Sequence, residues 1–208
     1  MTDEAPNAAM STGADSPTLS DGVVTLRSWS RDDAGFMAAA FADPAIRRYN
    51  GAHDADGYPG PPLSIGQAAA DIEGFTASWR AFAEMGRPSG AVFAIADAQT
   101  GELLGCTGVD DWSDERVAQI GYWLAPHARG KGFATRAVVL LTGWLFELGA
   151  TRVFLTVVEG NDASVAVARR AGFEYESTLP KHGAWMGERL DVVVFGKLPP
   201  TEANRPRR

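Results

Sequence analysis

The chain has 208 residues, of which 45% are hydrophobic, and a formal net charge of -7. This length and apolar fraction are typical of one compact domain with a substantial core. The negative charge argues against a nucleic-acid-binding protein, whose phosphate contacts need a basic face. No apolar run approaches the roughly 20 residues that span a bilayer, and the acidic start does not resemble a secretory signal. We therefore predict a cytoplasmic protein that binds neither nucleic acid nor membrane.

The single cysteine, Cys106, excludes an intramolecular disulfide and a cysteine-based zinc cluster. It stands within the apolar run 103–109, a position typical of a buried small residue and not of a nucleophile. We expect no metal site.

The N-terminal half is predicted to be mainly helical. Residues 1–18 are rich in small and polar residues without periodicity, which indicates a disordered tail. Two capping boxes mark helix starts, Ser30 with Asp33 and Ser64 with Gln67. The expected order is a strand over 23–28, a helix over 31–42, a helical turn near Ala45, a Gly/Pro/Asp loop over 51–62 and a helix ending near Met85.

The C-terminal half alternates strands with helices. Turn residues over 98–101 predict a hairpin, and Asn161 is expected to cap a short helix. Residues 180–187 are expected to form a loop, and 199–208 a flexible tail. Strands are predicted over 91–97, 103–109, 116–124, 151–158, 173–179 and 189–198, with a helix over 134–148. Together these elements predict a single α/β domain over residues 19–198.

A glycine-rich basic loop separates the strand that ends at Leu124 from the helix that begins near Ala134. The first N–H groups of a helix lack internal partners and carry the positive end of its dipole, so they attract anions. Glycines at 130 and 132 would let phosphate oxygens approach the main chain closely. A turn that needs glycine only for its backbone angles is an equally good interpretation of this loop taken alone.

Two named phosphate motifs are excluded, because no Ser or Thr follows Gly-Lys directly and the glycines do not fit GxGxxG. The remaining pattern, RxxGxA over Arg129–Ala134, resembles the pyrophosphate-binding signature of the GNAT acetyltransferases. Residues 120–137, IGYWLAPHARGKGFATRA, are similar to the branch typified by RimJ and RimL. The Asn-x-x-Ser of residues 161–164 and the Gly-Phe of 172–173 extend the similarity, which covers roughly residues 19–198.

The resemblance implies a GNAT fold, a mixed and mostly antiparallel sheet with one splayed parallel strand pair and helices on both faces. It implies that acetyl-CoA lies between the splayed strands, with the pantetheine along the main chain of Trp123 and Leu124. Asn161 would reach the pantetheine, although it is also a strong helix cap by type. The pyrophosphate would be held by main-chain amides of Arg129, Gly130, Lys131, Gly132, Phe133, Ala134 and Thr135.

The implied chemistry is direct attack of a neutral amine on the thioester. An amide at Leu124 would donate to the developing oxyanion, and Ser164 would protonate the leaving sulfur. The alternative for Ser164 is that it only completes the helix cap. Many relatives use a tyrosine for the sulfur, but the matching residue here is Ala168.

The general base is not identified by the sequence. Many relatives have glutamate where this chain has Gln119, which cannot accept a proton usefully. An acceptor α-amine with a pKa of about 8 is already partly neutral near pH 7 and would need only a weak base. The remaining candidates are Asp110, Asp111, Glu115 and His182.

The acceptor is expected to be a primary amine, either a protein N-terminus or a small molecule. An aromatic and acidic wall would suit a cation, and the candidates for it are Tyr49, Asp110, Asp111 and Trp112. Two other functions stay open, a non-catalytic acyl-CoA sensor and an anion-binding scaffold unrelated to coenzyme A. The resemblance also makes a homodimer plausible.

Overall fold

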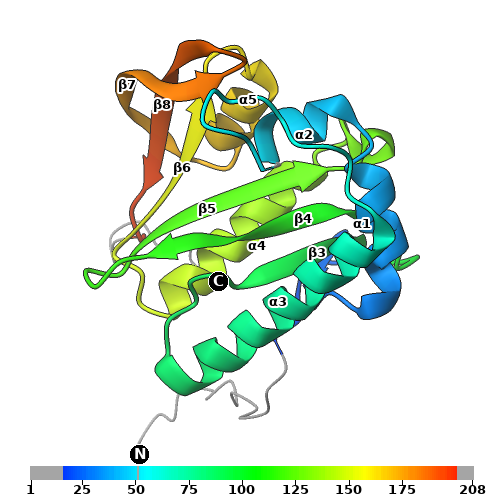
Figure 1. Ribbon diagram of the computed structural model, residues 1–208. Coiled ribbons are helices and arrows are strands. Elements are labelled where there is room, and N and C mark those ends of the chain that lie inside the picture. Colours follow the sequence, from blue (N-terminus) through cyan, green and yellow to red (C-terminus); the bar gives the residue numbers. More distant parts are fainter. Residues whose placement is uncertain (1–15, 51, 201–208) are drawn as a thin grey trace, which may run out of the picture.

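The computed structural model describes residues 16–50 and 52–200 (Figure 1). The predicted tails therefore lie largely outside the described residues, over 1–15 and 201–208. The described chain forms one eight-stranded sheet in the order β1-β2-β3-β4-β5-β6-β8-β7. The strands are β1 (Leu19–Ser20), β2 (Val24–Arg27), β3 (Val92–Asp97), β4 (Leu103–Trp112), β5 (Val117–Leu124), β6 (Arg152–Val158), β7 (Glu174–Trp185) and β8 (Glu188–Lys197).

Helices cover both faces of the sheet, as Figure 1 shows with α3 in front of it and α4 behind it. One buried cluster joins α1, α2 and α3 to the sheet through Met37, Ile46, Ile72 and Trp123. A larger cluster on the other face contains the apolar side of α4. The α-helices are α1 (Ala34–Ala40), α2 (Pro44–Asn50), α3 (Ile65–Met85), α4 (Phe133–Glu147) and α5 (Asp162–Arg170), and the 3-10 helices are η1 (Arg31–Asp33) and η2 (Pro126–Ala128).

The predicted helix starts are confirmed at atomic detail. The Ser64 side chain accepts from the Gln67 N–H while the Gln67 side chain accepts from the Ser64 N–H, and Ser30 with Asp33 forms the same reciprocal pair. Asn161 caps α5 by accepting from the Ser164 N–H at 3.2 Å. These short-range patterns depend on neighbouring residues alone, which is why the sequence predicts them well.

The parallel pair β5 and β6 separates partway along its length. Register runs from Val117 opposite Arg152 to Gln119 opposite Phe154 and stops there. The rest of β5 stays paired with β4, and the rest of β6 with β8. The predicted mixed sheet with one splayed parallel pair is therefore confirmed, and α4 connects the two diverging strands.

Two strands extend beyond their predicted ends. β4 continues to Trp112 through a register shift between Val109 and Asp111, which leaves Asp110 as a bulge residue. The prediction of a loop over residues 180–187 is wrong, because β7 continues to Trp185 and a turn at Met186 and Gly187 leads directly into β8. Both turn residues have positive φ, 47° and 81°, as a two-residue hairpin turn requires.

Candidate active site

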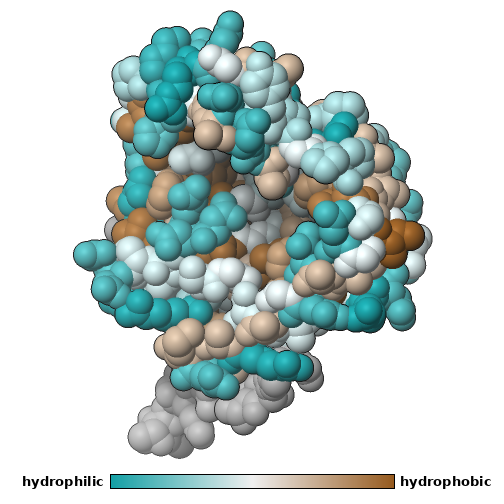
Figure 2. Space-filling model, in the orientation of Figure 1, coloured by the Kyte–Doolittle hydropathy of each residue, from teal (hydrophilic) through white to brown (hydrophobic). Residues whose placement is uncertain are grey.

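A cleft of about 610 Å³ opens where β5 and β6 diverge. Figure 2 shows the hollow on this face, with apolar residues inside a polar rim. Its walls come from α2, β4, β5, the glycine-rich loop, the start of α4, β6 and α5. The cleft thus collects residues from several elements at the place where β5 and β6 part.

The glycine-rich loop forms one end of this cleft. Gly130 and Gly132 have φ of 76° and 83°, and open space surrounds the position where each would carry a Cβ. The first helical bond from this region runs from the Arg136 N–H to the Gly132 carbonyl at 3.2 Å. The N–H groups of Phe133, Ala134 and Thr135 therefore have no helical partner, as expected at a helix start.

The Arg129 side chain has two partners beside the glycine-rich loop. Its Nε donates to the Leu124 carbonyl at 3.1 Å, and its guanidinium pairs with Asp43 at 2.8 Å.

The Ala125 N–H donates to the Leu104 carbonyl on the β4 side. Because N–H groups alternate along a strand, the Leu124 N–H faces the opposite edge, toward the gap between β5 and β6.

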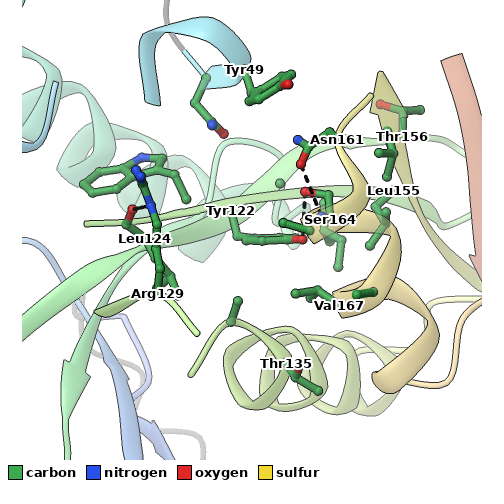
Figure 3. A pocket seen from close by; sticks show the side chains of 18 of the residues that line it. Tyr49, Tyr122, Leu124, Arg129, Thr135, Leu155, Thr156, Asn161, Ser164 and Val167 are labelled. Carbon is green, nitrogen blue, oxygen red and sulfur yellow. Dashed lines mark hydrogen bonds between the residues drawn. The ribbon is translucent and has the colours of Figure 1, made fainter. Parts of the chain in front are cut away.

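Ser164 stands at the start of α5 with two partners. The Tyr122 hydroxyl donates to its Oγ at 3.0 Å, and its own N–H donates to the Asn161 side chain. Figure 3 shows these three residues together on one wall of the cleft, with Tyr49 across the opening. Burial raises the pKa of the half-buried Tyr122, so this phenol stays protonated and remains a donor.

Asp110 enters the cleft from β4 at the bulge. A Cβ added to Gly121 would lie 2.8 Å from the Asp110 Oδ2, so glycine at 121 lets the carboxylate lie against the strand. Desolvation by the surrounding protein raises the pKa of Asp110 to about 6. Its side chain nevertheless stays open to solvent through the cleft, which keeps its charged form accessible.

The far wall of the cleft comes from α2, whose Tyr49 is held by aromatic contacts. The rings of Tyr49 and Trp185 stack with centroids 6.4 Å apart, and the Arg48 guanidinium lies 4.6 Å from the Trp185 ring. The tip of the β7–β8 hairpin also contacts the loop that follows α2, because the Gly187 N–H donates to the Asp56 carbonyl at 2.8 Å. This wall of the cleft therefore depends on segments more than a hundred residues apart.

Most of the sequence-predicted residues come together here. The lining contains Tyr49, Asp110, Trp123, Leu124, Arg129, Gly130, Gly132, Ala134, Thr135, Asn161 and Ser164. Lys131 and Phe133 adjoin it in sequence without lining it.

Other predicted residues lie elsewhere. Trp112 is 8% exposed and packs in the larger core cluster, so we do not retain it as an acceptor residue. Asp111 lies opposite Gln119 and does not line the cleft, whereas Asp110, the bulge residue before it, does. Sequence reasoning missed the Tyr122 side chain, whose partner is 42 residues away. No local signal marks such a contact.

The family model described as an acetyltransferase (GNAT) domain matches residues 24–174, well over half of the chain. The chain belongs to the GNAT acetyltransferase family. It is 27% identical over 188 residues to the uncharacterised N-acetyltransferase YoaA of Bacillus subtilis, covering 89% of this chain and 99% of YoaA. Its family and its named relatives identify it as an N-acetyltransferase.

Solved structures share the fold. RimJ of Mycobacterium smegmatis, in complex with CoA-disulfide, has a TM-score of 0.69 and 24% identity, covering 92% of this chain and 88% of RimJ. RimL, a ribosomal L7/L12 α-N-protein acetyltransferase in complex with coenzyme A, has a TM-score of 0.70 and 18% identity. That alignment covers 85% of this chain and 94% of RimL. The predicted likeness to the RimJ and RimL branch is confirmed at the level of fold.

Two further properties concern the described residues alone. None of their helices has the length and apolar character needed to cross a membrane. Within the same residues, no group of three or more His, Cys, Asp or Glu side chains could hold a metal ion.

Proposed function

We propose that this protein transfers the acetyl group of acetyl-CoA to a primary amine, with both substrates bound together in the cleft. The observation that carries the proposal is the glycine-rich loop, whose unpartnered N–H groups open into the cleft where β5 and β6 diverge. GNAT acetyltransferases use acetyl-CoA, and relatives of the same fold bind coenzyme A. The donor is therefore inferred from both the loop and the family.

The residues present fit a coenzyme A pyrophosphate. Unpartnered N–H groups at the start of α4 supply donors and a positive dipole, and the open space at Gly130 and Gly132 admits phosphate oxygens. Lys131 adds positive charge beside them, whereas the Arg129 side chain is already paired with Asp43. Asn161, Trp123 and Thr135 are further proposed contacts along the cleft.

When bound, acetyl-CoA supplies an activated acetyl thioester. The Leu124 N–H, which faces the gap, would donate to the thioester oxygen as negative charge develops there. The Ser164 hydroxyl would donate a proton to the sulfur. Because Tyr122 already donates to the Ser164 Oγ, the serine proton is left free to point toward the cleft.

The acceptor is proposed to be an uncharged or singly charged amine, carried by a peptide N-terminus or a small molecule. RimL, which shares the fold, is an α-N-protein acetyltransferase, and this supports a peptide amine as one candidate. Tyr49 and Asp110 would line the acceptor end of the cleft. An aromatic ring with a carboxylate is a suitable environment for an ammonium group.

The test is thiol release from acetyl-CoA in the presence of a panel of primary amines and N-terminal peptides. We expect release that requires both substrates and saturates in each, without a burst of thiol before the amine is added. Coenzyme A binding without turnover on any acceptor would contradict the proposal and favour an acyl-CoA sensor. Equal affinity for ATP and coenzyme A in calorimetric titration would favour an unrelated anion-binding scaffold.

A further inference from the structure

One of the four carboxylate and histidine candidates for the general base lines the cleft. Asp110 does, whereas Asp111, Glu115 and His182 are exposed at positions outside its lining. Among the described lining residues, Asp110 is also the one carboxylate. The cleft therefore offers a single acidic group to an incoming amine.

The bulge brings this carboxylate to the point where the strands part. Asp110 has no partner in β5, since the register passes from Val109 opposite Ile120 to Asp111 opposite Gln119. Its carboxylate lies against Gly121, two residues beyond Gln119, where the pairing of β5 with β6 ends. Asp110 keeps the side of the sheet that Cys106 has, as strand alternation requires, and the bulge shifts the alternation for the residues after it, so that Trp112 packs in the larger cluster with Val109.

Asp110 and Ser164 approach the gap from opposite faces of the sheet. Cys106, whose thiol pKa is raised in part by the Asp110 charge, belongs to the cluster under α1, α2 and α3. Tyr122, which contacts Ser164, packs against the cluster on the other face. A proton acceptor and a proton donor therefore flank the unpaired stretch of β5.

Desolvation raises the pKa of Asp110 to about 6, so the carboxylate is charged at pH 7 and above and still binds a proton readily near neutrality. Burial also raises the pKa of Cys106 to about 12, so its thiol is uncharged at the same pH. The titratable and charged groups that line the cleft with Asp110 are Tyr49 from α2, Tyr122 from β5, Arg129 from the loop and Arg170 from α5, and Cys106 from β4 is close enough to feel the Asp110 charge.

We propose that Asp110 accepts the proton that the acceptor ammonium loses before the amine attacks the thioester. The inference rests on the proposed transfer reaction. The nitrogen loses two protons overall, and the first passes to an Asp110 carboxylate oxygen and then to solvent through the open cleft. The second leaves the nitrogen as the N–C bond forms and the C–S bond breaks, and it replaces on the Ser164 oxygen the proton that Ser164 gives to the sulfur, so that the products are the amide and the free thiol.

The same charge pattern disfavours acceptors with a carboxylate next to the amine. The negative charge of such a carboxylate would be repelled by the charge of Asp110, and a nearby cation would be needed to offset this repulsion. Arg129 is paired with Asp43, and Arg48 lies against the rings of Tyr49 and Trp185. Arg170 lines the cleft from α5 and not from the wall that α2 forms. With Arg129 and Arg48 engaged by these partners, we expect free α-amino acids to be poorer acceptors than peptide-like amines.

The experiment compares wild type with Asp110→Asn in steady-state thiol release across pH 5–9. We expect Asp110→Asn to lower kcat about 100-fold at pH 7.5 and to leave the coenzyme A Kd unchanged. The wild-type rate should fall as pH decreases through about 6, and this fall should be absent in the variant. Asp111→Asn, which removes a neighbouring carboxylate outside the cleft, is the matched control and should behave as wild type.

A second variant displaces the carboxylate without removing it. Gly121→Ala would bring a methyl group within 2.8 Å of the Asp110 Oδ2 and push it aside, so kcat should fall while the acidic limb of the profile persists. Unchanged rates and an unchanged pH profile in Asp110→Asn would overturn the inference. Absence of turnover in wild type would instead count against the transfer reaction itself.

The acceptor arm uses a tripeptide amide and the free amino acid with the same side chain, compared at equal concentrations of neutral amine. We expect the tripeptide amide to have the higher kcat/KM by at least about tenfold, as one unbalanced charge typically costs. Equal kcat/KM values for the two would contradict the charge argument. A preference for the free amino acid would overturn it outright.

Discussion

The two ends of the cleft are built in different ways. The end proposed for coenzyme A comes from one continuous stretch, in which the glycine-rich loop joins β5 to α4. The end proposed for the acceptor is lined by α2 and the bulge in β4, with the β7–β8 hairpin packed against Tyr49 from outside, and these segments lie far apart in sequence.

In the proposed function, the two ends would recognise their substrates in different ways. The loop presents main-chain N–H groups, which are there whatever the side chains are, so only the glycines and the helix start matter. The acceptor end presents particular side chains, Asp110 and Tyr49, whose positions depend on the packing of three separate elements. A common donor can thus be bound by a short motif, while the acceptor site is free to vary around it.

The largest expected effect is at the loop. Gly132→Glu introduces a side chain at φ 83° and a negative charge beside the proposed pyrophosphate, and we expect coenzyme A affinity to fall more than about 100-fold. Gly101→Glu is the matched control, because Gly101 has φ 75° and open surroundings in the β3–β4 turn. Calorimetric titration measures both. Equal losses in the two variants would mean that strain, and not the anion site, is responsible.

The next effect concerns the proposed proton donor. Ser164→Ala keeps the main-chain N–H that Asn161 caps, so coenzyme A binding should hold while kcat falls about 100-fold. Tyr122→Phe keeps the ring and removes the hydrogen bond, so a fall of about fivefold is expected. The double variant should be no slower than Ser164→Ala alone. Additive effects in this cycle would exclude a shared role for the two hydroxyls.

A smaller effect is expected at the hairpin tip. An added Cβ at Gly57 would lie 2.4 Å from the Ala184 carbonyl, so Gly57→Ala should separate this loop from the hairpin and disturb the Tyr49 wall. We expect a higher acceptor KM with an unchanged coenzyme A Kd. Gly22→Ala, with φ 83° and open surroundings, carries similar backbone strain away from the contact. A KM change in both variants would refute the assignment of this wall to the acceptor.

The smallest effect is on stability. Because folding raises the pKa of Asp110 from its ordinary value of 3.8 to about 6, the folded state loses stability as pH rises from about 4 to about 6. Asp110→Asn should therefore raise the free energy of unfolding by about 1 kcal/mol at pH 7.5, a value reduced for solvent screening in the open cleft. Urea unfolding at pH 7.5 and below pH 4 tests this, and the gain should vanish at the lower pH.

Local sequence patterns predicted helix starts well, because residues close in sequence determine them. Ser64 and Gln67 marked the start of α3, and Asn161 marked the start of α5. The prediction was wrong over 180–187, where Met186 and Gly187 form a tight turn that keeps β7 and β8 paired to their tips. Positive φ at a methionine has no reliable sequence signal, because its cost is offset by pairing and by contacts with the 52–60 loop.

The sequence by itself determined the family motif, the anion loop and the order of the elements, because these depend on contiguous residues and on the periods of helix and strand. Only the tertiary structure distinguished Asp110 from Asp111. A single extra residue in a strand reverses the faces of the side chains that follow it, and whether the register slips depends on the partner strand. The contact of Tyr122 with Ser164 was decided in the same way, by the divergence of two strands that brings β5 against α5.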